Sequence, residues 1–112
     1  MSAPRLTRPL VLEEAQQLPD GAGGFLRDWV ALGTLWADVK PGAGRERAGE
    51  TASLATMPYR ITVRAAPQGA ASRPRPDQRF RDGARLFRIL AVSEADAGGH
   101  YLRCVAQEEV VA

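Results

Sequence analysis

Short stretches in which apolar and polar residues alternate, separated by turn residues, run through most of the 112-residue chain. Alternation with a period of two is typical of strands that bury one face. The clearest example is Tyr59–Ala65, in which Tyr59, Ile61 and Val63 alternate with polar residues. The pattern predicts five to six strands, and the other segments are Pro9–Ala15, Phe25–Val39, Gln78–Arg81, Arg85–Val92 and Tyr101–Gln107.

The segment Phe25–Val39 is the most apolar part of the chain, and it has two interpretations. Four of its large residues are spaced as on one face of a helix. We favour a strand, because Gly33 and Thr34 interrupt the middle and the residues after them alternate. Its two tryptophans, Trp29 and Trp36, are then expected in the core or at a subunit interface.

The segments between the strands indicate how the strands are connected. Asp82-Gly83 is a dipeptide favoured in tight hairpins, and most other connections are short, so neighbouring strands are expected to run antiparallel. Closure of such a small sheet removes its exposed edges. The predicted fold is therefore mainly β, a small antiparallel β-barrel in one domain spanning 1–112. Outside the strands we expect a flexible N-terminal arm (1–8), a long exposed loop with room for a short helix (41–58) and a Pro/Arg-rich connector (66–77).

The net charge of +2 hides an uneven distribution. Residues 60–88 contain eight arginines against two aspartates, a net charge of +6 that leaves the rest of the chain acidic. Three interpretations fit: a nucleic-acid surface, the solvated faces of strands with a basic loop, or docking of basic on acidic surfaces between protein copies.

The chain contains few residues suited to catalysis or metal binding. One cysteine and one histidine exclude an internal disulfide and a four-ligand Cys/His zinc site. His100 and Cys104 lie roughly 13 Å apart along an extended strand, too far for direct proton transfer. The adjacent carboxylates of the two Glu-Glu pairs point to opposite faces of a strand. We therefore expect no enzyme, no cofactor and no metal. The chain also has no apolar run of membrane-spanning length and no signal peptide, so we expect assembly in the cytoplasm.

Several motifs follow one another in an order that is similar to a known family. They are Leu35-Trp36-Ala37-Asp38-Val39-Lys40-Pro41, Gly44-Arg45-Glu46, Tyr59-Arg60-Ile61-Thr62-Val63-Arg64, Asp82-Gly83-Ala84-Arg85-Leu86-Phe87 and Tyr101-Leu102-Arg103-Cys104. Over residues 5–109 their order resembles the phage head–tail joining family, the head-completion or stopper proteins of long-tailed phages. The stretch from Arg75 to Arg85 also resembles the versions in alphaproteobacterial gene transfer agents.

The resemblance implies a structural connector in the neck of a virion or virus-like particle, assembled in the bacterial cytoplasm. Copies of the chain would form a ring, a hexamer in this family, between the portal and adaptor proteins and the tail terminator or tail tube proteins. Double-stranded DNA would pass through this ring without sequence-specific contacts, and no membrane is involved. The ring would help to retain DNA and to dock the tail. The loop 42–57 would face the channel or contact the adaptor, through Arg45, Glu46, Arg47, Glu50, Leu54 and Met57.

Contacts between subunits are expected where the basic segment of one copy meets the acidic flanks of another. The candidate residues for contacts with a subunit or a neighbouring protein are Arg5, Arg8, Arg60, Arg64, Arg79, Arg81, Glu108 and Glu109. Two other functions stay open. One is a small-barrel nucleic-acid-binding protein, with tryptophans and tyrosines as stacking platforms. The other is a neighbouring tail-terminator or tail-completion protein.

Overall fold

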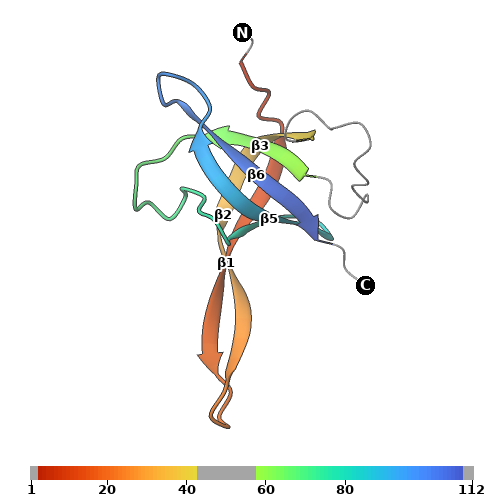
Figure 1. Ribbon diagram of the computed structural model, residues 1–112, viewed down its shortest axis with the longest axis vertical. Helices are drawn as coiled ribbons and strands as arrows, with labels where there is room; N and C mark the ends of the chain where they lie inside the picture. The colour runs from red at the N-terminus through yellow and green to blue at the C-terminus, as the bar shows by residue number, and fades with distance from the viewer. Residues whose placement is uncertain (1–2, 43–57, 110–112) are drawn as a thin grey trace, which may run out of the picture.

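A computed structural model describes residues 3–42 and 58–109, which form six β-strands and no helix. The strands pair antiparallel in the order β1-β2-β3-β6-β5-β4, and β4 pairs with β1, which closes the sheet into a barrel (Figure 1). The predicted small antiparallel barrel is confirmed. Within the described residues there is no helix long and apolar enough to cross a membrane. The strands are β1 (Arg8–Pro19), β2 (Phe25–Pro41), β3 (Pro58–Arg64), β4 (Arg79–Asp82), β5 (Arg85–Glu94) and β6 (Tyr101–Glu109).

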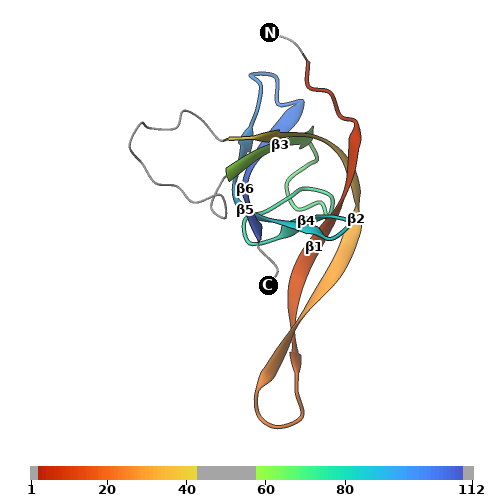
Figure 2. The same ribbon diagram turned by 90° about the vertical axis from the view of Figure 1, so that its right-hand side faces the viewer.

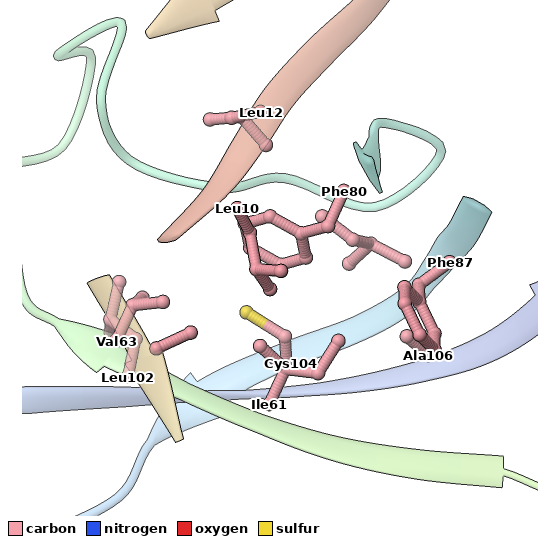
Figure 3. Packing of buried hydrophobic residues seen from close by; sticks show 11 residues of the cluster. Leu10, Leu12, Ile61, Val63, Phe80, Phe87, Leu102, Cys104 and Ala106 are labelled. Carbon is pink, nitrogen blue, oxygen red and sulfur yellow. The ribbon is translucent and has the colours of Figure 1, made fainter. Parts of the chain in front are cut away.

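The alternation within each strand decides which side chains fill the barrel. In β3, Ile61 and Val63 are fully buried, whereas Arg64 is exposed. Phe80 of β4 and Phe87 of β5 are the largest side chains of the core (Figure 3). The ring of Phe87 meets that of Tyr59 edge to face. The buried apolar cluster comprises Leu10, Leu12, Ala37, Ile61, Val63, Phe80, Phe87, Ile89, Leu102, Cys104 and Ala106.

The first two strands run further than the sequence predicted. β1 continues four residues past Ala15, to Pro19, and pairs with β2 as far as Phe25. The strand interpretation of the segment from Phe25 is confirmed, and the helical interpretation is wrong. The turn between the strands is held by Asp20, whose Oδ1 accepts hydrogen bonds from the backbone N–H of Ala22 (2.8 Å) and Gly24 (3.0 Å).

The outer part of this hairpin projects from the barrel as a two-stranded ribbon (Figures 1 and 2). We call residues 14–30 the β1–β2 arm. β1 pairs with β4 only through Val11–Glu13, and β2 pairs with β3 only from Ala37 onward. Both outer edges of the arm are therefore unpaired among the described residues. The arm contributes to a longest dimension of 53 Å.

A bulge lies where the arm leaves the barrel. Leu12 pairs with Gly33 and Glu13 with Ala31, so Leu32 is an extra residue on β2. Gly33 has φ +148°, a backbone conformation that residues with a Cβ rarely adopt. A bulge bends a strand and increases its twist. The sequence signal that seemed to interrupt the strand thus marks the point where it turns out of the barrel wall.

Candidate functional site

Glu13 lies where the arm joins the barrel and binds two arginines of β4. Its carboxylate accepts hydrogen bonds from the Nε of Arg79 (2.7 Å) and the Nε of Arg81 (2.8 Å). These side chains share the outer face of the sheet, because Glu13 pairs with Arg79 and Arg81 is two positions further along β4. The guanidinium of Arg79 also lies over the ring of Trp29, 4.0 Å from its centroid. Charge and stacking together connect the base of the arm to the barrel.

Because Glu13 is buried, water screens its ion pairs less than it screens exposed ones. The Glu13 side chain is only 7% exposed. Burial acts to raise its pKa, but the hydrogen bonds from Arg81 and Arg79 and their positive charges outweigh burial, so that the pKa lies below its ordinary value of 4.5. Glu13 is therefore ionised in the folded protein at neutral pH and fixes the two cations.

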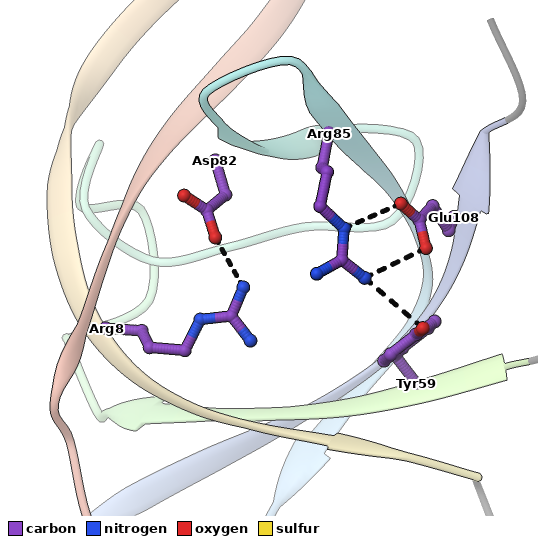
Figure 4. A network of polar contacts seen from close by, with 5 residues as sticks. All are labelled: Arg8, Tyr59, Asp82, Arg85 and Glu108. Carbon is purple, nitrogen blue, oxygen red and sulfur yellow. Dashed lines mark hydrogen bonds and ion pairs between the residues drawn. The ribbon is translucent and has the colours of Figure 1, made fainter.

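A second polar network occupies one end of the barrel (Figure 4). Arg85 donates from Nε and Nη2 to both carboxylate oxygens of Glu108, at 2.8 and 3.0 Å, and from Nη2 to the hydroxyl of Tyr59 at 3.3 Å. Arg8 pairs with Asp82 nearby. The hydrogen bond from Arg85 is the main cause of a lowered pKa at Glu108, and it raises the pKa of Arg85 in turn.

This polar end is also where the chain leaves β2 and re-enters β3. The backbone N–H of Gly42 donates to the carbonyl of Pro58 at 2.7 Å, and the Nε of Arg60 donates to the carbonyl of Gly42 at 3.0 Å. Gly42 and Pro58, the described residues on either side of 43–57, are thus held together. Its six candidate channel residues lie outside the described residues: Arg45, Glu46, Arg47, Glu50, Leu54 and Met57.

The eight candidate contact residues fall into two groups. The first group already has partners within the chain: Arg8, Arg79, Arg81 and Glu108 in ion pairs, and Arg60 with a backbone carbonyl. The second group is exposed and comprises Arg5, Arg64 and Glu109. Two further acidic residues, Glu14 and Asp77, also pair with arginines of the basic segment. The expectation that this segment meets acidic residues of other copies stays a prediction, and the exposed group is where it applies.

The histidine and the cysteine have separate surroundings. The Nδ1 of His100 lies 2.9 Å from the Oδ2 of Asp96 in the turn before β6. Cys104 points into the core, where burial raises the pKa of its thiol to about 12 (Figure 3). The part of the chain from 3 to 42 and from 58 to 109 holds no group of three or more His, Cys, Asp or Glu suited to a metal ion.

The folded protein is expected to resist thiol reagents. Because the thiolate is the reactive form, Cys104 should react with a disulfide reagent at pH 8 at least about 100-fold more slowly than in urea-unfolded protein. Stopped-flow absorbance of the released thiol measures both rates. Equal rates would show that the barrel opens readily around β6.

Neither tryptophan belongs to the buried apolar cluster. Trp36 is 57% exposed, because it lies on the outer face of β2, between Leu35 and Ala37, which face the core. It borders a hollow of about 350 Å³ that is also lined by Leu6 and Arg64. A core position is thus wrong for Trp36, whereas a position at a subunit interface stays a prediction. Trp29 is half-buried beneath Arg79.

A second hollow, of about 370 Å³, lies on the outer wall formed by β2, β3 and β6. Its lining combines three cations with two carboxylates, and the sequence had not suggested it. The charged residues are Asp38, Lys40, Arg60, Asp96 and Arg103. Mixed charge on an open wall is suited to contacts with another protein surface, since neither sign dominates.

Comparison with known proteins identifies a family and two similar structures. The sequence model of the phage head completion protein family matches residues 1–109. A chain in the structure of the virion of a native gene transfer agent particle is 64% identical, with a TM-score of 0.79 over 98% of this chain and 100% of that chain. The solution structure of protein SF1141 from Shigella flexneri 2a has a TM-score of 0.71 at 22% identity, over the full length of both chains, and shows the shared fold alone. The search of curated proteins finds no match.

The family match and the virion chain show a structural protein of a phage or gene transfer agent particle. The chain belongs to the phage head completion protein family. This is a structural family and not an enzyme family, in agreement with the expectation from the sequence.

Proposed function

We propose that the chain is a connector in the neck of a phage or gene transfer agent particle. Copies of it form a ring between the portal or adaptor and the tail, help to retain packaged DNA and provide the surface on which the tail docks. One observation carries the proposal: the 64% identity, over nearly the whole of both chains, to a chain of a native gene transfer agent virion. Family membership over residues 1–109 supports it independently.

The described surfaces suit such a role. Gly42 and Pro58, which flank residues 43–57 in the sequence, are bonded to each other at the end of the barrel that carries Arg85 and Glu108. We infer that this segment faces the channel or the adaptor. Its residues include both charge signs, which suits weak, sequence-independent contact with DNA, because a purely cationic loop would bind phosphates tightly and slow DNA exit.

Deletion of the gene in a particle-producing host tests the proposal. Particles without the protein are expected to contain heads but no attached tails, and to transfer DNA at least about 100-fold less efficiently. Electron microscopy of purified particles counts the tails, and mass spectrometry confirms that the protein is absent. A plasmid copy of the gene should restore both, whereas tailed and active particles without the protein would contradict the proposal.

The free nucleic-acid-binding alternative has one feature in its favour, the exposed Trp36 beside Arg64. It predicts that single-stranded DNA quenches the tryptophan fluorescence of the isolated protein and that salt weakens this binding. We expect no quenching at micromolar protein in physiological salt. Tight binding together with absence from particles would favour this alternative over the connector.

A further inference from the structure

The outer part of the β1–β2 arm exposes large apolar side chains that its own barrel does not cover. Leu18 is 44%, Phe25 66% and Leu26 60% exposed. Leu18 pairs directly with Leu26, so the two form one apolar patch on a single face of the ribbon. Asp28, two positions from Leu26, lies on the same face and is exposed. The arm thus presents an apolar patch with a carboxylate beside it.

The outer part of the arm gains little stability from its own chain. A two-stranded ribbon without a covered face is marginally stable in water, and its open edges can pair with other chains. It also cannot fold back on its own barrel, because Leu26 and Trp36 are ten residues apart on one continuous strand, roughly 33 Å. Residues 3–42 and 58–109 leave the patch uncovered, so it is open to another molecule.

The complementary surface is present on the barrel of the same chain. The hollow beside Trp36 is lined by Leu6, Leu35 and the exposed ring of Trp36 itself, with Arg64 at its border. No carboxylate of the described residues lies within ion-pair distance of Arg64. This surface offers an apolar floor and a cation that no carboxylate of residues 3–42 and 58–109 pairs with, the counterpart of the patch on the arm.

We infer that the β1–β2 arm of one copy docks on the Trp36 hollow of the next copy. Leu18 and Leu26 cover the indole, and Asp28 faces Arg64 of the neighbour. The two surfaces are different, so the contact is heterologous and repeats from copy to copy until it closes into a ring. The inference rests on the proposed ring and names the contact that holds it together.

Crosslinking within assembled particles tests the contact. Gln16 lies on the arm face that carries Leu18 and Leu26, whereas its neighbour Gln17 lies on the opposite face, and both are exposed. Thr34 lines the hollow. Particles carrying Q16C/T34C, treated with a short bis-maleimide, should give a ladder of multimers of this chain on denaturing gels. The buried Cys104 does not compete for the reagent.

The matched control is Q17C/T34C, which we expect to crosslink at least about tenfold less. Two outcomes overturn the inference while the proposed function stands: the protein is in the particles but stays monomeric after crosslinking, or Q16C links it to a different particle protein. Absence of the unmodified protein from particles contradicts the proposed function instead.

A charge exchange tests the ion pair across the contact. D28R and R64D alone should each reduce incorporation into particles about tenfold, because each places like charges opposite one another. D28R/R64D should restore incorporation, whereas the control D28R/R103D should not, since Arg103 lies on β6 outside this hollow. Circular dichroism of each isolated variant separates loss of folding from loss of contact. Failure of D28R/R64D to restore incorporation, in variants that fold, contradicts the pairing.

Discussion

Replacing Phe87 with alanine is expected to lower the free energy of unfolding by about 3–5 kcal/mol. Phe87 is fully buried, and its ring meets Tyr59 edge to face, with centroids 5.1 Å apart. A cavity at this position removes contacts between β5 and β3, the two strands that flank β6 in the barrel. Urea denaturation followed by circular dichroism measures the change.

The matched control is the same substitution at Phe25, whose side chain is 66% exposed at the end of the arm. Here the free energy of unfolding should change by no more than about 0.5 kcal/mol, as is usual for surface positions. A loss of stability at Phe25 as large as that at Phe87 would mean that the arm folds back on its own barrel, contrary to the structure.

Glu13→Gln is expected to destabilise the protein by about 1–3 kcal/mol at pH 7, because it weakens two charge-assisted hydrogen bonds of a nearly buried carboxylate. The pKa of Glu13 is lower in the folded state than its ordinary value of 4.5, so ionised Glu13 contributes stability above that pH. This contribution disappears as the pH falls through the folded-state pKa. The difference between wild type and variant should therefore shrink between about pH 6 and pH 3.

Denaturation series at several pH values measure this difference. Glu14→Gln is the control, since Glu14 pairs with the largely exposed Arg75 and such pairs contribute little. It should change the free energy of unfolding by less than about 1 kcal/mol. A difference at Glu13 that stays constant with pH would show that packing and not charge is lost.

The candidate site was predicted less completely than the fold. Arg64 was named from the sequence as a contact residue and is exposed as expected. Arg79 and Arg81 were named for the same reason, yet both bind Glu13 of their own chain. The partners in these two pairs are separated by 66 and 68 positions in the sequence. Charge composition cannot reveal partners that are so far apart. The apolar end of the arm was missed because apolar residues in a strand ordinarily indicate a core.

The sequence by itself determined that the chain forms strands, their alternation and residues that fill the barrel, such as Ile61 and Val63. Alternation is local: each strand records its own buried face, whatever its neighbours are. Only the tertiary structure decided where the barrel stops and the arm begins, because this depends on how far β3 and β4 extend along their partners. β2 is 17 residues long, but β3 has 7 and β4 has 4. The outer parts of β1 and β2 extend past these shorter neighbours and therefore form an exposed surface.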